Sequence, residues 1–450
     1  MDTIVAVATS PGRSAIGIVR LSGTESLEIL RGLIHDQSFT PEPRRVSLKQ
    51  IVRESGEPLD SALVCYFAGP HSFTGEEMVE VSCHGSPVIL RGVLDLTQNL
   101  GARLAEPGEF TLRACKNGKM NLSQAEAIRD LINARTDAAA VQAARQLKGE
   151  LSAALQPAKD KLIQIIVRLE SALEFVEDDL PRIQAEEIRK KLAEVVAAVA
   201  GLAVTFATGR ALREGLKVTI VGRPNAGKSS LFNKLIGSNR AIVTDLAGTT
   251  RDSISESISL GGIPISLTDT AGIRIANDEI EEIGVERTHQ AMADADLLVV
   301  VIDGSTRLAA EDLAIVSEAM RGRHVVAINK CDLVNETGLE DQLGQPLQVV
   351  HLSALTGEGL AELTAAILSP FGAVDSETVG LLITDTRHYD LLRRTQASLE
   401  KSVELFSQSA SEEIVLVGLH SALKFLGEIT GETTADDILD KIFRTFCIGK

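Results

Sequence analysis

The chain is 450 residues long, which predicts about two to four domains that can each bury a core. A hydrophobic fraction of 44% with 24% charged residues is ordinary for a soluble globular protein, and no apolar run approaches the length of a membrane span. A net charge of −17 argues against broad nonspecific nucleic-acid binding, and 3% aromatic residues without any Trp argue against base-stacking platforms.

Residues 1–118 alternate short β-like runs with Gly/Pro turns and brief helices, which predicts an α+β domain. The β-like runs are residues 3–8, 17–21, 62–67 and 78–82. Residues 119–213 are rich in Ala, Leu and charged residues and contain few helix breakers, so they predict several long amphipathic helices.

Residues 214–373 form a separate zone of apolar strands and helices that carries the nucleotide motifs. Residues 374–450 are helical again, with apolar positions at helical spacing in 391–406 and 414–425. Because helical zones stand on both sides of residues 214–373, we expect this domain to be inserted into one helical domain. The expected fold class is therefore multidomain, α/β plus α.

Residues 222–229 read Gly-Arg-Pro-Asn-Ala-Gly-Lys-Ser, a complete phosphate-binding loop between an apolar strand, 217–221, and a helix that begins at Ser230. In such a loop the glycines let backbone N–H groups approach the phosphates at the start of the helix. We expect Lys228 to reach the β- and γ-phosphates as a catalytic residue, and the Ser229 hydroxyl to ligate Mg²⁺.

Three further guanine-nucleotide motifs follow at strand ends. Asp-Thr-Ala-Gly at 269–272 places a carboxylate where it can hold the Mg²⁺ shell. Asn-Lys-Cys-Asp at 329–332 ends in a carboxylate that can accept two hydrogens from the N1/N2 edge of guanine, a pair that adenine lacks. Ser353 and Ala354 complete the guanine pocket.

Between the first two motifs lies Gly-Thr-Thr-Arg-Asp at 248–252, where Thr250 is the expected switch threonine on Mg²⁺. Motifs at strand ends, separated by helical stretches, predict an inserted Ras-like, parallel-sheet P-loop GTPase domain that binds nucleotide at the carboxyl edge of its sheet. Gly261 and Gly262 predict a hairpin turn and one antiparallel strand pair in this domain.

Ile273 follows the Asp-Thr-Ala-Gly motif, where the small signalling GTPases carry a glutamine that positions the attacking water. Isoleucine neither donates nor accepts a hydrogen bond, so other groups must orient the water and neutralise charge. Asn225 is a candidate ligand for a monovalent cation in place of an arginine finger, and a plain loop-turn asparagine is the alternative. The acidic run 278–282 lies just beyond, with a solvated helix start as its alternative interpretation.

Together with the insertion layout, these motifs resemble the bacterial tRNA modification GTPases of the MnmE (TrmE) family over the whole chain. The matching segments outside the phosphate loop are 2–6 (Asp-Thr-Ile-Val-Ala), 72–76 (Ser-Phe-Thr-Gly-Glu), 107–110 (Pro-Gly-Glu-Phe), 244–252 (Thr-Asp-Leu-Ala-Gly-Thr-Thr-Arg-Asp), 269–274 (Asp-Thr-Ala-Gly-Ile-Arg) and 447–450 (Cys-Ile-Gly-Lys). Ribosome-assembly GTPases share the nucleotide motifs alone, whereas the flanks and the tail are specific to this family.

The resemblance implies a K⁺-activated GTPase that works with the FAD-containing partner MnmG. Together they would add an aminomethyl or carboxymethylaminomethyl group to C5 of the tRNA wobble uridine. The one-carbon unit would come from a 5-formyltetrahydrofolate-type folate held in the N-terminal domain, which also forms the homodimer. By resemblance, Arg20, Glu80, Lys119 and Lys450 bind this folate, since cations can pair with its glutamate tail and a carboxylate can read its pterin edge.

The resemblance also implies the ion ligands. K⁺ would be held by Asn225, Thr244, the backbone carbonyl of Leu246, and Thr249, whereas Mg²⁺ would be held by Ser229 and Thr250. Glu281 matches the catalytic, water-positioning glutamate of the family, and Arg274 is a weaker candidate for an internal finger. The residues expected to bind GTP are Asn225, Ala226, Gly227, Lys228, Ser229, Ser230, Thr244, Thr249, Thr250, Asp269, Thr270, Ala271, Gly272, Asn329, Lys330, Asp332, Ser353 and Ala354.

Two hypotheses follow. The first is an enzyme of tRNA wobble-uridine modification, and the second is a GTP-dependent assembly factor or switch whose flanks only dock; folate binding discriminates them. Two roles of Cys447 stay open: it could be a nucleophile near the one-carbon donor, or a partly buried apolar residue before the functional tail. The number of cysteines is odd, and their spacing is not that of a metal site, which suits a reducing compartment. The chain opens without a signal segment. We therefore expect a cytoplasmic protein with no membrane contact.

Overall fold

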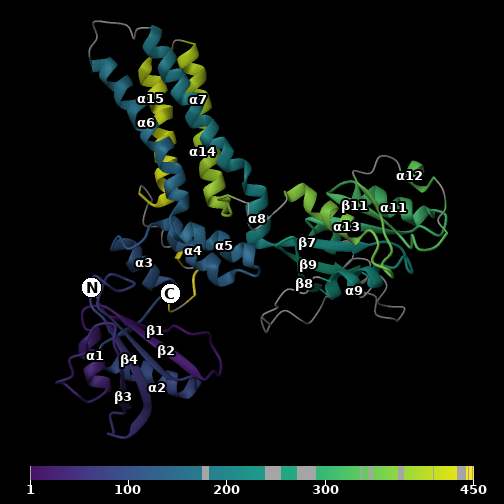
Figure 1. Cartoon of the computed structure of the whole chain (residues 1–450). Helices are drawn as coiled ribbons and strands as arrows, with labels where there is room; N and C mark the ends of the chain where they lie inside the picture. Colours follow the sequence, from purple (N-terminus) through teal and green to yellow (C-terminus); the bar gives the residue numbers. More distant parts are fainter. Residues whose placement is uncertain are drawn as a thin grey trace. The chain divides into compact units, whose positions relative to one another are not determined.

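The structure is a computed structural model of the chain. It describes residues 2–174, 182–238, 255–270, 290–334, 336, 338–343, 348–372, 380–408, 410–432, 442–443, 445–447 and 449. The chain divides into two compact units, one of Met1–Arg129 with Gly427–Lys450 and the other of Asp130–Leu426. The expected fold class, an N-terminal α+β part, long helices and a parallel-sheet nucleotide domain, is confirmed (Figure 1).

The first unit contains a six-stranded sheet with the strand order β3-β4-β5-β2-β1-β6. Neighbouring strands are antiparallel except β1 and β6, which are parallel. The strands are β1 (Ile4–Val7), β2 (Ile16–Ser22), β3 (Val46–Val52), β4 (Pro58–Phe67), β5 (Met78–His84) and β6 (Arg103–Leu104).

Two helices, α1 (Ser26–Leu33) and α2 (Pro87–Asn99), pack on this sheet. The sheet side of this core comes from alternate residues of its strands, such as Val79, Val81 and Cys83, because side chains of a strand point to opposite faces in turn. This alternation leaves Arg20 and Glu80 together on the other face. The pattern places polar side chains on one face of a rigid sheet.

The C-terminal tail packs within the same unit, against α3 (Glu109–Lys116) and the start of α4 (Leu122–Asn133). Phe443 and Phe446 are buried with Leu122, and the Gly108 amide donates to the Cys447 carbonyl at 3.4 Å. The tail is therefore held beside the segment that precedes α3.

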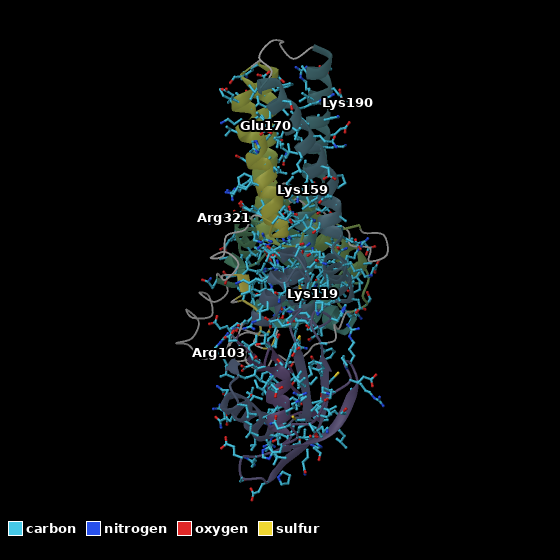
Figure 2. The ribbon with its side chains drawn as sticks, turned by 90° about the vertical axis from the view of Figure 1, so that its left-hand side faces the viewer. Arg103, Lys119, Lys159, Glu170, Lys190 and Arg321 are labelled. Atoms are coloured by element: carbon cyan, nitrogen blue, oxygen red, sulfur yellow. The ribbon has the colours of Figure 1, made fainter. Side chains whose placement is uncertain are left out.

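The second unit contains four long helices packed as a bundle (Figure 1). These are α6 (Glu150–Glu174), α7 (Arg182–Val204), α14 (Thr386–Ser407) and α15 (Glu412–Thr430). Along α7 the buried apolar residues recur at helical spacing, as in Leu192, Val195 and Val199, so one stripe of the helix faces its neighbours. Charged side chains such as Glu170 on α6 and Lys190 on α7 cover the exposed side (Figure 2).

One sequence expectation needs correction here. The helical stretch Ala185–Glu214, made of α7 and α8 (Phe206–Glu214), is long and apolar enough to cross a membrane by length and composition. Its apolar character comes mainly from the Ala- and Val-rich residues 195–204. Such a helix is weak evidence of a membrane span, because the core helix of a bundle passes the same test.

The nucleotide domain of the second unit is built on a six-stranded sheet with the order β12-β11-β10-β7-β9-β8. Neighbouring strands are parallel except β8 and β9, which form the antiparallel pair predicted from Gly261 and Gly262. Both glycines have positive φ, +53° and +82°, as a tight hairpin turn requires. The strands are β7 (Leu216–Val221), β8 (Ser255–Leu260), β9 (Ile263–Asp269), β10 (Leu297–Asp303), β11 (His324–Asn329) and β12 (Val349–His351).

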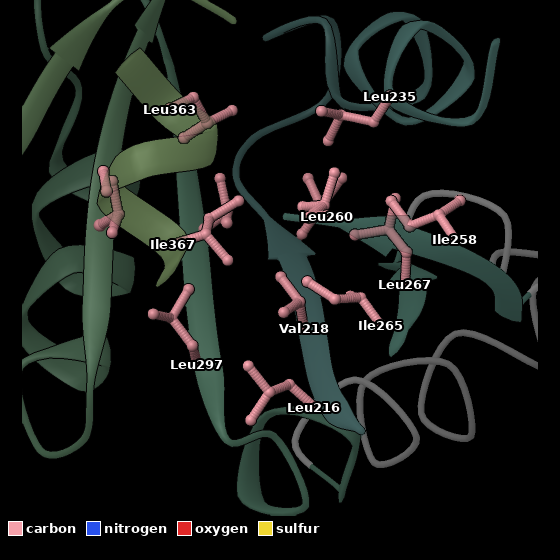
Figure 3. Close-up of a cluster of buried hydrophobic side chains, with 14 of the residues drawn as sticks. Leu216, Val218, Leu235, Ile258, Leu260, Ile265, Leu267, Leu297, Leu363 and Ile367 are labelled. Carbon is pink, nitrogen blue, oxygen red and sulfur yellow. The ribbon is translucent and has the colours of Figure 1, made fainter. Parts of the chain in front are cut away.

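Helices cover both faces of this sheet. On one face α9 (Lys228–Ser238) and α13 (Leu360–Leu368) pack on the strands, as Leu235, Leu363 and Ile367 show in Figure 3. On the other face α11 (Ala310–Ala319) and α12 (Leu339–Gln342) do the same. The central strand β10 is apolar up to its last residue, Asp303, because alternate residues of 297–302 enter the two cores.

The segment that leads out of the nucleotide domain is held by α5 (Asp137–Leu147). The Gln142 side chain donates to the Gly380 carbonyl at 2.9 Å, and Gln146 donates to the Leu382 carbonyl at 3.1 Å. Extended backbone after the domain therefore finds its hydrogen-bond partners on a helix that precedes it in the chain.

Candidate functional site

The phosphate loop follows β7, and its last two residues, Lys228 and Ser229, begin α9. Gly222 lies so close to β10 that an added Cβ would stand 2.3 Å from the Val301 carbonyl oxygen, and its φ is +148°. Asn225 has a φ of +64°, the left-handed region that asparagine tolerates better than most residues. Lys228 donates from Nζ to the Arg223 carbonyl at 2.7 Å. The loop therefore wraps around the lysine and starts a helix, the arrangement that binds phosphate.

Asn329 joins the phosphate loop to the guanine motifs. Its Nδ2 donates to the Ala226 carbonyl at 2.9 Å, and its Oδ1 accepts the Ala354 amide at 2.9 Å. An added Cβ on Gly227 would stand 2.1 Å from Asn329 Nδ2, so only glycine fits there. The structure thus brings three of the predicted motifs together through one buried amide.

The predicted Mg²⁺ ligand on α9 meets the carboxylate at the end of β9. Ser229 Oγ donates to Asp269 Oδ2 at 2.8 Å, and Asp269 is 3% exposed. A hydroxyl and a carboxylate supply the hard oxygen ligands that Mg²⁺ prefers. Thr270 next to them donates to the Ile220 carbonyl at 2.9 Å, which fixes the end of β9 beside β7. The described residues therefore fit the ion that a GTPase site needs.

The base side of the site is formed by the loops after β11 and β12. Ser353 Oγ donates to Asp332 Oδ1 at 2.5 Å, which orients the carboxylate expected to read guanine. Lys330 donates from Nζ to Asp303 Oδ2 at 2.5 Å. Burial alone would raise the pKa of Asp303, but hydrogen bonds from Lys330 and Ser305 outweigh it and hold that pKa below its ordinary value.

Three residues of this site were not predicted from the sequence. Arg223 donates from Nε to Asp312 Oδ1 at 2.7 Å, and Asp303 holds Lys330. Asp303 ends a buried apolar strand, so the strand-end rule that found Asp269 could have found it. The pairing of Arg223 with Asp312 links residues 89 positions apart and has no local signature.

Several predicted residues lie outside the residues that the structure describes. They are Thr244, Leu246, Thr249, Thr250, Ala271, Gly272, Ile273, Arg274, Glu281 and Lys450. Of the predicted K⁺ ligands, Asn225 is therefore the described one, and of the predicted folate residues Arg20, Glu80 and Lys119 are described.

In the first unit, Arg20 and Glu80 are direct partners across β2 and β5. Arg20 Nη2 lies 2.7 Å from Glu80 Oε1, and Nη1 donates to the Gly449 carbonyl at 3.3 Å. The guanidinium also lies 5.8 Å from the ring centroid of Phe73 and 5.9 Å from that of Phe110. Charge, a carboxylate, two aromatic rings and the tail backbone meet on this face of the sheet, a set that suits a flat, polar, anionic molecule.

Lys119 contacts the loop that carries Phe73. Its Nζ donates to the Pro70 carbonyl at 2.8 Å, and Asn117 donates to the Thr74 carbonyl at 2.7 Å. Among the described residues, Lys119 thus holds the loop rather than the Arg20 and Glu80 pair.

A second ionic cluster supports this loop and was missed by the sequence analysis. Arg113 is buried and donates to Asp2 at 2.7 Å, to Glu109 at 2.9 Å and to Glu76 at 3.2 Å. Burial would lower the pKa of Arg113, but the carboxylates around it raise that pKa overall. The cluster ties the chain start, α3 and the loop together, and its members come from separate segments that no local pattern joins.

Two family models match the chain. One, described as the MnmE helical domain, matches residues 122–447, and the other, described as the GTP-binding protein TrmE N-terminus, matches residues 3–119. The chain belongs to the MnmE family. The predicted resemblance is therefore confirmed.

Relatives of known name agree over full length. The chain is 46% identical over 450 residues to the tRNA modification GTPase MnmE of Aquifex aeolicus (strain VF5), with 100% of both chains covered. It is 46% identical over 453 residues to the tRNA modification GTPase MnmE of Koribacter versatilis (strain Ellin345), with 100% of this chain and 99% of the relative covered.

Solved structures similar to this MnmE-family chain cover part of it. A variant of Aquifex aeolicus Era bound to GDP and aluminium fluoride is 24% identical, with 41% of this chain and 66% of that chain covered and a TM-score of 0.29. The G domain of the FeoB iron transporter of T. maritima is 28% identical, with 34% of this chain and 97% of that chain covered and a TM-score of 0.26.

Proposed function

We propose that this chain is a K⁺-activated GTPase that acts in modification of the tRNA wobble uridine. With an FAD-containing partner of the MnmG kind, it would add an aminomethyl or carboxymethylaminomethyl group at C5, using a one-carbon unit from a 5-formyltetrahydrofolate-type folate. The observation that carries the proposal is the joining of the phosphate loop to the guanine motifs through Asn329, together with the hydrogen bond from Ser229 to Asp269, in a chain of the MnmE family.

The geometry of the phosphate loop supports the proposed nucleotide roles. Lys228 and the amides at the start of α9 would bind the phosphates, and Ser229 with Thr250 would hold Mg²⁺. Mg²⁺ would neutralise charge on the phosphate oxygens when it is bound. Asp332, oriented by Ser353, would accept hydrogens from guanine.

K⁺ activation is supported by two features of the described loop. Asn225 stands in the left-handed conformation within the phosphate loop, and its amide oxygen is a possible ligand for a cation. Arg223, the arginine of the same loop, is paired with Asp312, which leaves the role of an arginine finger to an ion. We propose that Thr244, the Leu246 carbonyl and Thr249 complete the K⁺ shell, and that Glu281 positions the water.

The folate role is proposed for the polar face of the N-terminal sheet. Arg20 would pair with the glutamate tail of the folate, and Glu80 would read the edge of its pterin. Phe73 and Phe110 lie beside the Arg20 guanidinium. Lys119 and Lys450 would add positive charge.

We further propose that the functional domains are residues 1–118, 119–213, 214–373 and 374–450. The first of these domains would form a homodimer, and the protein would be located in the cytoplasm.

The ion model is tested by GTP turnover in matched K⁺ and Na⁺ salts. We expect turnover to fall strongly in Na⁺, since an arginine finger or its substitute is worth roughly 10³–10⁵ in rate. Asn225→Ala should remove the difference between the salts. Equal rates in both salts with the unchanged protein would remove Asn225 from the mechanism.

The proposed role in tRNA wobble-uridine modification is tested by folate binding and by analysis of tRNA nucleosides. Calorimetry with 5-formyltetrahydrofolate should show binding that Arg20→Gln weakens, with Arg45→Gln, an exposed arginine of the same unit, as the control. Mass spectrometry of tRNA nucleosides from a deletion strain complemented by this chain should show the modified wobble uridine. GTP hydrolysis without either result would favour the assembly-factor or switch hypothesis.

A further inference from the structure

Arg223 occupies the second position of the phosphate loop, and its two ends face different partners. Its carbonyl accepts Lys228 Nζ at 2.7 Å, whereas its guanidinium donates from Nε to Asp312 Oδ1 at 2.7 Å. Gly222 before it is packed on β10, and Asn225 after it is in the left-handed conformation. The path of the loop around the lysine is thus fixed by the side chain of Arg223 as well as by backbone geometry.

Asp312 is a buried carboxylate whose two oxygens are both used. It is 2% exposed and lies in the first turn of α11, where Oδ2 accepts the Ala309 amide at 3.0 Å while Oδ1 accepts Arg223. A buried carboxylate is tolerated when it is paired and hydrogen-bonded, and a position near a helix N-terminus favours its negative charge. Asp312 therefore has a defined geometry that it imposes on Arg223.

The same connection reaches the guanine side of the site. Asp303, at the end of β10, accepts Lys330 Nζ, and the Gly304 amide donates to the Asn329 carbonyl at 2.8 Å. Residues 303–312 thus contact the base motif at one end and the phosphate loop at the other. This short segment is therefore a second connection between the two halves of the nucleotide site, besides the direct one through Asn329.

We infer that Arg223 and Asp312 are positioning residues for the nucleotide, holding the phosphate loop at a fixed distance from the guanine motif. The inference rests on the proposed GTPase function and deepens it. Because the Arg223 guanidinium is bound to Asp312, we expect the pair to act equally on bound GTP, bound GDP and the transition state. Its loss should therefore weaken binding and raise KM while kcat stays nearly unchanged.

The opposite outcome is expected for a catalytic arginine. A guanidinium that neutralised charge in the transition state would, when removed, lower kcat by roughly 10³-fold or more with little change in KM. The split between KM and kcat thus decides whether Arg223 acts on the loop or on the reacting phosphate.

The experiment uses the full-length protein and fluorescent mant-GDP. Arg223→Gln and Asp312→Asn should each speed mant-GDP release about tenfold or more, as expected for losing one hydrogen bond to a charged group. Glu311→Gln is the matched control, because Glu311 is an exposed acid of the same helix turn that acts on Arg223 only through its charge. It should change release less than about twofold.

The double variant Arg223→Gln with Asp312→Asn should release mant-GDP no faster than the weaker-binding single variant, because the two residues act as one unit. Arg223→Lys should restore part of the affinity while the circular dichroism melt of all variants stays within a few degrees of the unchanged protein. Strictly additive effects, an equal effect of Glu311→Gln, or a loss confined to kcat would each overturn the inference. If the unchanged protein failed to bind mant-GDP, the proposed function itself would fall.

Discussion

Arg213 Nη1 donates to Asp385 Oδ2 at 2.8 Å, and this bond joins the helix that leads into the nucleotide domain to the helix that follows it. Arg213 lies in the last turn of α8, just before β7, whereas Asp385 is the N-cap of α14. Arg213 Nε also donates to Asp130 Oδ1 at 3.0 Å. One guanidinium therefore connects the segment that enters the inserted domain with the segment that leaves it.

Arg213→Gln is expected to lower the free energy of unfolding of the second unit by about 2 kcal/mol. This cost is smaller than that of breaking a fully buried ion pair, because the Arg213 side chain is 20% exposed. The two carboxylates would keep their burial and lose a charged partner. Arg210→Gln on the same helix breaks an exposed pair with Glu214 and should cost about 0.5 kcal/mol or less. Urea unfolding followed by circular dichroism measures both, and equal costs would show that this connection contributes nothing specific.

The motif residues at strand ends could be predicted because each is a local pattern. Ser229 and Asp269 stand 40 positions apart and meet at 2.8 Å. Asp269 ends β9 and Ser229 ends the loop that follows β7, and the carboxyl ends of these parallel strands share one edge of the sheet. The hairpin at Gly261 and Gly262 was predictable for the same reason, because its turn type demands glycine.

The pairs that connect these local patterns could not be predicted. Arg223 with Asp312, and Arg213 with Asp385, each join elements whose relative placement is decided by packing of the sheet and the bundle. A single arginine in a charged sequence has many possible partners, and its own neighbours do not rank them. The family resemblance supplied ligand roles, whereas these supports follow only from the fold.

The ion pairs of Glu109 predict a pH-dependent contribution to stability. Burial alone would raise the pKa of Glu109, but hydrogen bonds from Arg103, the Glu106 amide and Arg113 hold that pKa below its ordinary value of 4.5. Because the pKa is lower in the folded state, the stabilisation is present above about pH 4.5 and is lost as pH falls through the folded pKa. We expect Arg103→Gln to lower the unfolding temperature at neutral pH, and this difference to shrink between about pH 5 and pH 3. Calorimetry of the full chain over this range measures the effect.

The control for this series is Arg45→Gln. Arg45 pairs with Glu42 at 2.7 Å, but both side chains are mostly exposed, so the change should have little effect at any pH. An effect of Arg103→Gln that persists unchanged at acid pH would show that the Glu109 carboxylate is not its cause.

The cysteines are expected to differ in reactivity. Burial, with a smaller effect of Asp60 on Cys83 and of Glu126 on Cys115, raises the pKa of each of these thiols to about 12. The thiolate is the nucleophile, and at about pH 8 only on the order of one in 10⁴ of these thiols would be ionised. Both cysteines should therefore react slowly. Cys447 is exposed and should be labelled first by iodoacetamide, as read by peptide mass spectrometry. Rapid labelling of Cys83 in the folded protein would contradict its burial.

Asp332→Asn is expected to exchange the base preference of the nucleotide site. The carboxylate, oriented by Ser353 Oγ, would accept both the N1 and N2 hydrogens of guanine, whereas an amide would offer one acceptor and one donor. Xanthine carries an oxygen where guanine carries its N2 amine, so the variant should lose about 10–100-fold in GTP affinity and gain affinity for xanthosine triphosphate. Competition with mant-GDP measures both constants, and Asp341→Asn, an exposed acid on α12, should leave both unchanged. If the variant lost GTP without gaining xanthosine triphosphate, Asp332 would support the loop rather than read the base.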